Sequence, residues 1–132
     1  MSIKIVVLDA ARLPAGVDFP PLAAEKYGWE QYPQLAEDDI AERCWRADIV
    51  VTLGSAIEAA SLEKMIKLGL LICAGDACGR VDQVAATGRG IEILAFPDAP
   101  LDSVAGAQTL CQRISAAIDY YIRCSRRSET DA

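Results

Sequence analysis

The sequence contains no histidine among its 132 residues. Histidine is the general base of Ser-His-Asp and Cys-His catalysis, and it is also the commonest metal ligand in proteins. Its absence excludes these catalytic sites, and any histidine-based metal site, from this chain. The residues of this chain alone therefore lack one common route to enzyme chemistry.

Basic residues are also fewer than acidic ones. The chain has 13 Lys and Arg against 19 Asp and Glu, which gives a net charge of −6 and a pI near 4.6. Nucleic acids and anionic membranes both attract clustered basic side chains, so this balance argues against either as a partner. The cluster Arg123, Arg126 and Arg127 is diluted by Glu129 and Asp131, and we interpret it as a frayed tail.

No apolar run reaches the roughly 18 residues of a membrane span, and no signal peptide precedes the first apolar run, so we expect a cytoplasmic protein.

The cysteines do not form a recognisable framework. Their number is odd and their spacing irregular, which fits neither a secreted disulfide scaffold nor a CxxC zinc site. They are Cys44, Cys73, Cys78, Cys111 and Cys124. We predict five free thiols.

Short apolar runs alternate with helical stretches along the chain. The runs predict strands at residues 3–8, 29–32, 48–52, 70–73 and 91–95, with helices at 22–27, 39–46, 62–68 and 81–87 and a long helix at 102–123. Runs rich in Val and Ile indicate strands covered on both faces, as in a parallel sheet. The pattern predicts an α/β three-layer sandwich, with a five-stranded parallel sheet in the flavodoxin-like order 2-1-3-4-5.

Local signals mark the predicted helix ends. Asp39 and Glu42 form a variant of the capping box, which predicts a helix start at Asp39. Gly28, Gly69 and Gly88 each follow a predicted helix, where a left-handed residue is favoured.

Ligands of such sheets bind beyond the carboxyl ends of the strands, so the loops there are the candidate site. These loops are residues 9–14, 53–56, 74–80 and 96–100, and each of them carries Gly, Ser or Asp. The alternative is that Gly and Asp only form turns, and the residues alone favour that interpretation about two to one.

Several segments carry a resemblance to a known family. They are residues 3–9 (IKIVVLD), 47–52 (ADIVVT), 80–86 (RVDQVAA), 89–91 (RGI) and 102–105 (DSVA). In order and spacing they resemble the N-terminal, substrate-binding half of the D-isomer-specific 2-hydroxyacid dehydrogenases. The resemblance covers residues 2–122, and it is the collinearity of these segments that is specific rather than any one motif.

The resemblance implies a domain that lacks its catalytic partner. In that family the helix after the Ser-Val-Ala motif leads into a Rossmann NAD domain, which supplies the glycine fingerprint, the catalytic arginine and the acid/base histidine with its carboxylate. The sequence contains none of these motifs. We therefore predict no catalytic residue and no cofactor in this chain, and NAD only if a partner chain supplies the binding domain.

The positions that face the substrate in the family have also changed. Leu53 replaces the usual Asn, Ala77 replaces a glycine, and Asp76 adds a charge that repels anions, while Arg80 can still attract a carboxylate. Gly106 takes the place of the Glu that follows Ser-Val-Ala. The candidate substrate-binding residues are Gly54, Ser55, Asp76, Ala77, Cys78, Gly79, Arg80 and Asp98.

Two further groupings were weighed. Asp76, Asp98 and Asp102 could converge as an acid/base or divalent-metal cluster, but we favour a turn role for Asp98 and a helix cap at Asp102 or Ser103, at about four to one. Cys78 lies near a helix N-terminus, where a thiolate would be stabilised. With no base available, we interpret it as an ordinary thiol.

These observations favour a stand-alone, catalytically incomplete 2-hydroxyacid dehydrogenase-like domain, inactive alone, that acts as a small-molecule-binding or interaction module. Its expected ligand is a small 2-oxo or 2-hydroxy acid. The alternative is the substrate-binding component of an NAD-dependent oxidoreductase completed by a separate NAD-binding chain. An adjacent gene for such a domain would favour the alternative.

The long helix predicts a dimer. Its apolar positions are Ala107, Leu110, Cys111, Ile114, Ala117, Ile118, Tyr121 and Ile122, which form one stripe at helical spacing. We expect a sheet already covered on both faces to leave little room for this helix, so we predict a homodimer through residues 102–123.

The predicted organisation is a substrate-binding-type domain at 1–100, the helix at 101–124 and a tail at 125–132.

Overall fold

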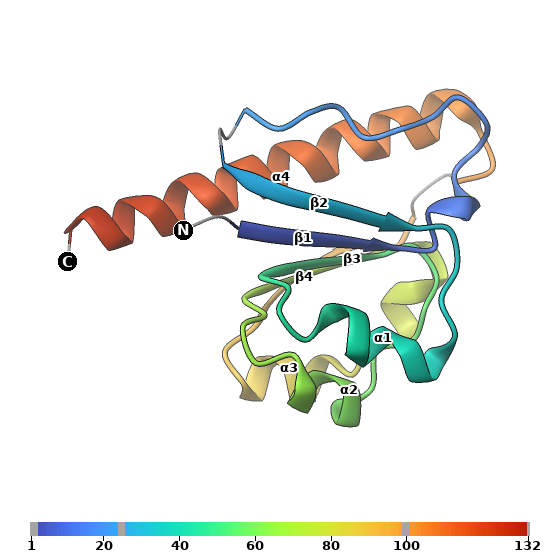
Figure 1. Cartoon of the computed structure of the whole chain (residues 1–132). Helices are drawn as coiled ribbons and strands as arrows, with labels where there is room; N and C mark the ends of the chain where they lie inside the picture. Colours follow the sequence, from blue (N-terminus) through green and yellow to red (C-terminus); the bar gives the residue numbers. More distant parts are fainter. Residues whose placement is uncertain (1–2, 24–25, 99–100, 132) are drawn as a thin grey trace.

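The computed structural model describes residues 3–23, 26–98 and 101–131, without the side chains of residue 37 and residues 125–131 (Figure 1). The strands are β1 (Ile3–Leu8), β2 (Tyr27–Tyr32), β3 (Ile49–Thr52), β4 (Leu70–Ala74) and β5 (Glu92–Phe96). The helices are α1 (Glu37–Cys44), α2 (Ala59–Lys64), α3 (Gln83–Gly88) and α4 (Val104–Asp131), with short 3-10 helices η1 (Ala10–Arg12) and η2 (Gly75–Gly79).

The five strands form one parallel sheet in the order β2-β1-β3-β4-β5, as the sequence predicted. In its register, Ile5 of β1 lies between Trp29 of β2 and Ile49 of β3. Because all strands run the same way, their carboxyl ends meet at one edge, on the right of Figure 1.

The central strands supply two separate cores. Successive side chains of a strand point to opposite faces. Val6 and Leu8 accordingly join one buried cluster, and Ile5 and Val7 join another. Helices α1, α2 and α3 cover the first face and α4 covers the second (Figure 1). The predicted three-layer α/β arrangement is therefore confirmed.

The apolar stripe of α4 packs on the chain's own sheet. Leu110, Ile114, Ile118 and Ile122 are at most 3% exposed and belong to the same buried cluster as Ile5 and Val7. The expectation that this stripe lacked room on the sheet was wrong, because no other α-helix in the described residues covers that face. A dimer through α4 stays a prediction, but the buried stripe does not supply its interface.

The predicted helix at residues 22–27 does not form in the described residues. Residues 22, 23 and 26 are not helical, Tyr27 already belongs to β2, and residues 24–25 lie outside the description. The chain instead runs beside α4: Ser115 Oγ donates to the carbonyl of Pro20 at 3.2 Å, and the amide of Ala23 donates to the Asp119 carboxylate at 3.0 Å. These hydrogen bonds hold the segment in an extended path along α4, which covers this face of the sheet.

Several predicted helix ends were also wrong. Helix α1 starts after Ala36, without a side-chain cap, rather than at Asp39. The glycines with positive φ in the described residues are Gly16, Gly75 and Gly90, not the three that were predicted. The cap of α4 is as predicted, because Ser103 Oγ accepts a hydrogen bond from the amide of Gly106 at 2.9 Å.

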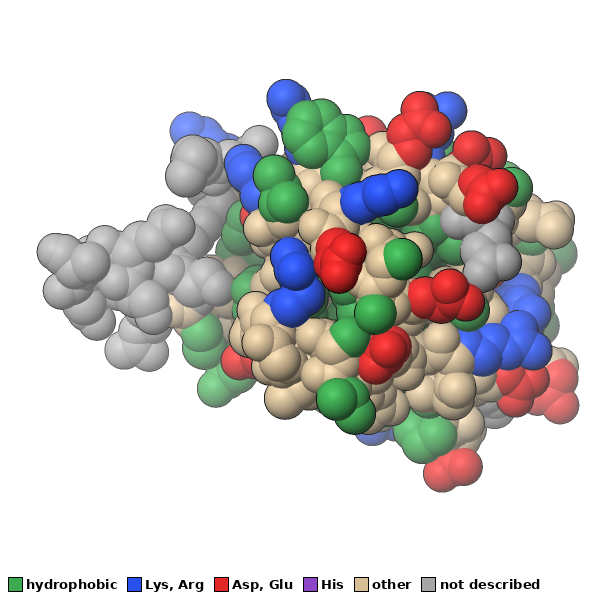
Figure 2. All heavy atoms as spheres, turned by 90° about the horizontal axis from the view of Figure 1, so that it is seen from below, with side chains coloured by type: hydrophobic (Ala, Val, Ile, Leu, Met, Phe, Trp, Pro, Cys, Tyr) green, Lys and Arg blue, Asp and Glu red, His purple; other side chains and the backbone are tan. Residues whose placement is uncertain are grey.

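The face formed by α1, α2 and α3 carries acidic and basic side chains interspersed with apolar ones (Figure 2). Exposed Trp45 lies on this face under the guanidinium of Arg46, whose central carbon is 4.3 Å from the ring centroid.

Among the described residues, no helix has the length and apolar character needed to cross a bilayer.

The packing of α4 predicts unequal effects at a buried and at an exposed position of this helix. We expect Ile118→Ala to lower the free energy of unfolding by about 2–5 kcal/mol, because truncating a fully buried side chain leaves a cavity. Val104 is 60% exposed, so Val104→Ala should change the free energy of unfolding by less than about 0.5 kcal/mol. Urea unfolding followed by circular dichroism measures both, and equal losses would contradict this packing.

Another exposed position of the same helix, Tyr120, reports on the predicted dimer. Tyr120 lines a groove of about 800 Å³ between β5 and α4, where a second copy would contact it. Light scattering should then give twice 14.2 kDa for the wild type and a single 14.2 kDa chain for Tyr120→Asp. A wild-type particle of 14.2 kDa at every accessible concentration would show that no such dimer forms.

Candidate functional site

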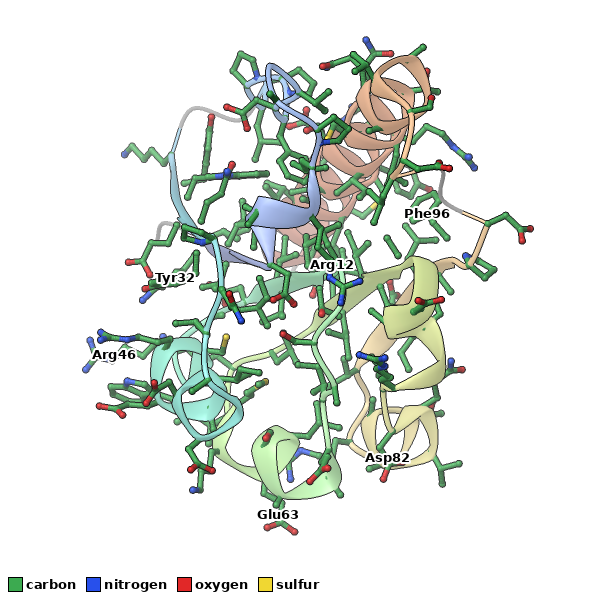
Figure 3. The ribbon with its side chains drawn as sticks, turned by 90° about the vertical axis from the view of Figure 1, so that its right-hand side faces the viewer. Arg12, Tyr32, Arg46, Glu63, Asp82 and Phe96 are labelled. Carbon is green, nitrogen blue, oxygen red and sulfur yellow. The ribbon has the colours of Figure 1, made fainter. Side chains whose placement is uncertain are left out.

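Loops after β1, β2, β3 and β4, together with α1, line an open cavity at the carboxyl edge of the sheet. The cavity has a volume of about 300 Å³ and is lined by Asp9, Arg12, Gln34, Leu35, Ile40, Gly54, Ser55, Ala56 and Arg80. Figure 3 looks onto this edge, with Arg12 near its middle and Tyr32 and Phe96 at opposite sides. The edge is where parallel α/β sheets bind their ligands.

Two arginines meet at Gly54. The side chain of Arg12 lies across this glycine so closely that a Cβ there would be 2.2 Å from Arg12 Nε and would displace the guanidinium. Arg80 Nη1 donates to the carbonyl of Gly54 at 3.2 Å. The ion pair of Lys4 with Glu30 involves neither arginine, and within the described ranges no ion pair is found for Arg12 or Arg80. Both guanidinium groups therefore retain donors for a ligand.

Polar contacts hold the rest of the cavity wall. Asp9 has φ of 63°, a left-handed conformation that Asp tolerates better than most residues, and its carboxylate accepts a hydrogen bond from Ser55 Oγ. Thr52 Oγ1 donates to the carbonyl of Ser55 at 2.9 Å. These bonds fix the loop after β3, so the cavity presents two cations and one anion in a set arrangement.

The structure brings together only part of the predicted site. Gly54, Ser55 and Arg80 line the cavity. Ala77 is fully buried in the core, Cys78 packs against that core, and Asp76 and Gly79 face outward, so none of these η2 residues lines it. Asp98 instead lines a separate cavity of about 470 Å³, in which Arg113 lies 4.9 Å from the Phe96 ring centroid.

Sequence reasoning missed Asp9 and Arg12. It places their loop at the carboxyl edge of the sheet but names neither as a site residue. The available signal was that Arg12, like Arg80, is a basic residue in one of these loops.

The predicted alternative of a carboxylate cluster finds no support. Within the described ranges, no group of three or more acidic, Cys or His residues could hold a metal ion. Asp82 has a structural role as the cap of α3, because its carboxylate accepts the amide of Ala85 at 3.0 Å.

Burial suppresses ionisation of three cysteines. It raises the pKa of Cys44 to about 12, that of Cys73 to about 12 and that of Cys111 to about 11. Cys124 is exposed, and all five cysteines are free thiols, as predicted.

These shifts predict a loss of stability at alkaline pH. An unfolded thiol titrates near 9.0, so between pH 9 and about 12 the unfolded state releases a proton that folded Cys44 retains. The free energy of unfolding should fall as pH rises through this window, by up to about 1.4 kcal/mol per pH unit for each such thiol. Urea unfolding at pH 8, 9 and 10 measures the slope.

Variants separate this slope from other titrations. Cys44→Ala should remove the contribution of one thiol to the pH slope of the free energy of unfolding. Cys124→Ala, at an exposed thiol, should leave that slope unchanged. Equal slopes in the two variants would refute the assignment to Cys44.

Comparison with known proteins identifies related sequences. The family model described as D-isomer specific 2-hydroxyacid dehydrogenase, catalytic domain, matches residues 5–108. A Haemophilus influenzae protein whose name assigns it to the 2-hydroxyacid dehydrogenases is 31% identical over 90 residues. The match covers 68% of this chain but 28% of that relative's length.

Solved structures show the same fold at low identity. A 3-phosphoglycerate dehydrogenase of Entamoeba histolytica with bound NAD+ has a TM-score of 0.56 at 20% identity, over 72% of this chain and 33% of the other. An acyclic imino acid reductase in complex with NADPH and D-Arg has a TM-score of 0.54 at 18% identity, over 70% and 30%. The pyruvate reductase of Chlamydomonas reinhardtii has a TM-score of 0.53 at 16% identity, over 73% and 29%.

Proposed function

Because this chain belongs to the D-isomer-specific 2-hydroxyacid dehydrogenase family, through its catalytic domain, we propose that it binds a small 2-hydroxy or 2-oxo acid in the carboxyl-edge cavity. The observation that carries the proposal is the pair Arg12 and Arg80 on one cavity wall, with no ion-pair partner among the described residues. Guanidinium groups hold carboxylates through paired, charge-assisted hydrogen bonds.

The cavity's other polar groups suit the rest of such a ligand. A volume of about 300 Å³ is at the small end of ligand sites, which fits a molecule of a few carbon atoms. Asp9 repels a carboxylate, so the acid group lies toward the arginines. The Asp9 carboxylate can accept a hydrogen bond from a ligand hydroxyl, so we expect a 2-hydroxy acid to bind more tightly than the matching 2-oxo acid.

The residues of this chain do not fit NAD(H). A dinucleotide fold places its glycine-rich turn after the first strand, where backbone amides approach the pyrophosphate. Here that turn runs from Asp9 to Arg12 and contains no glycine. The chain also has no histidine to exchange a proton with a substrate hydroxyl. We propose that this domain contributes binding and not hydride transfer.

The second candidate is a component of an oxidoreductase. The family match to a catalytic domain favours it, and the chain spans 28% of the length of the Haemophilus influenzae relative. In this case the cavity would hold the substrate while a separate chain supplied NAD and the acid/base residues. Both candidates use Arg12 and Arg80 in the same way, so activity separates them.

Substituting either arginine should weaken acid binding. A hydrogen bond to a charged group contributes about 1.5–3 kcal/mol, so we expect Arg12→Ala and Arg80→Ala each to lower the affinity for oxalate about tenfold or more. Isothermal titration calorimetry measures this directly.

Two controls sharpen the titration. Arg89 follows α3 and precedes β5, at the opposite edge of the sheet, so Arg89→Ala should bind oxalate like the wild type. Arg80→Lys keeps the charge but not the planar fork, and should fall between wild type and Arg80→Ala. Wild-type affinity in both alanine variants of the cavity would disprove the proposed site.

Activity measurements decide between the two candidates. The purified chain should not oxidise NADH in the presence of glyoxylate or pyruvate, because it lacks the dinucleotide turn and a histidine. The decrease of NADH absorbance measures the rate. If NADH is consumed only when an NAD-binding chain is added, the second candidate is correct; turnover by the pure chain would refute the proposed division of roles.

A further inference from the structure

A second cavity lies between the end of β5 and the first turns of α4. It has a volume of about 470 Å³ and shares no lining residue with the acid-binding cavity. Phe96, on its wall, and Arg12, in the acid-binding cavity, lie at different places along the carboxyl edge of the sheet (Figure 3). The function proposed above makes no use of this second cavity.

Small side chains of α4 leave this space open. Ala105, Thr109 and Arg113 are spaced four residues apart, so they follow one another along one face of the helix. Ala105 and Gly106 occupy little of the volume beside the end of β5. Two turns further on, the long side chain of Arg113 places Cζ 4.9 Å from the centroid of the Phe96 ring.

Most of the cavity wall is apolar. Leu110 is a buried member of the core on this face of the sheet, and Phe96 packs against that core. Pro97 continues the wall and has no amide hydrogen to donate. The hydroxyl of Thr109 donates to the carbonyl of Ala105 at 3.0 Å, so its proton is already in use. This wall therefore suits the apolar part of a ligand.

Arg113 brings a positive charge to the cavity. A guanidinium above an aromatic ring is attracted to the ring face, and its N–H groups at the rim can still donate to an acceptor. Within the described ranges no ion pair is found for Arg113, although Asp98 lines the same cavity. Because one cation and one carboxylate leave the cavity without net charge, a dianion meets more repulsion there than a monoanion.

We propose that this cavity binds a monocarboxylic acid with an apolar body. The carboxylate lies on the rim of the Arg113 guanidinium, which holds such groups through charge-assisted hydrogen bonds. The apolar body lies against Phe96, Pro97 and Leu110. A volume of about 470 Å³ is within the range of small-molecule sites. Oxalate has no apolar body, so the two cavities select different classes of acid.

Chain length and charge of the ligand test the two halves of the site. In isothermal titration calorimetry, the affinity should rise from butanoate to hexanoate to octanoate by about fourfold for each methylene that is buried. Octanamide keeps the alkyl chain but has no charge, so it should bind about tenfold or more weakly than octanoate. Equal affinities for butanoate and octanoate, or for octanoate and octanamide, would overturn the proposal.

Substitutions test the location of the site. Arg113→Gln, at an exposed side chain, should lower the affinity for octanoate about tenfold or more. Ala105→Phe, also at an exposed position, retains Arg113 but fills the cavity, and it should likewise weaken binding. Arg89→Gln, at the opposite edge of the sheet, should bind octanoate like the wild type. Circular dichroism checks that each variant is folded. Wild-type affinity in both cavity variants would show that octanoate does not bind here.

Competition separates this cavity from the first. Saturating oxalate should leave octanoate binding unchanged, because the two cavities share no residue. In NMR spectra of the wild type, octanoate should shift the amide signals of residues 96 and 105–110. Displacement by oxalate, or shifts confined to residues 53–56 and 80, would assign octanoate to the first cavity and refute the second site. Octanoate binding without oxalate binding would refute the proposed function alone.

Discussion

The structure depends on strands that are buried on both faces. Each of β1, β3 and β4 sends alternate side chains into two different cores, so a shift of one residue in register would exchange the two sets. Asp48 reinforces this register at the amino edge: its carboxylate accepts the amide of Lys4 at 2.9 Å and its carbonyl accepts the amide of Gly69 at 2.9 Å. A sheet held in this way sets the position of every loop at the opposite edge, including those that form the cavity.

The elements with two-sided burial were the ones that the sequence could predict. Strands such as residues 70–74 are apolar at nearly every position, so their type and order follow from composition and from the handedness of crossovers. The partner of a one-sided element was harder to predict. The stripe on α4 indicated a buried face, but the same spacing fits a helix packed on its own sheet or on another subunit. The packing follows from the long segment after β1, which runs beside α4 instead of forming a helix on that face.

The site shows the same division. That Gly54, Ser55 and Arg80 line a cavity at this edge of the sheet follows from the carboxyl-edge rule, which needs only the ends of the strands. That Arg12 joins them depends on the left-handed turn at Asp9 and on the direction of one long side chain. Neither is encoded in periodicity or composition. Likewise, nothing in the sequence distinguished Ala77, whose side chain enters the core, from the residues around it that do not.

Two glycines link distant parts of the chain in a way that has consequences for substitution. A Cβ at Gly69 would lie 2.1 Å from the hydroxyl oxygen of Tyr121, just as one at Gly54 would meet Arg12. Each glycine thus leaves room for a large side chain from a segment far away in the sequence. Each contact is made by the far end of a side chain, so a residue gained at 69 or 54 would displace the Tyr121 hydroxyl or the Arg12 guanidinium. At residue 54 that displacement would move Arg12 within the cavity, so a substitution there alters the candidate site as well as the packing.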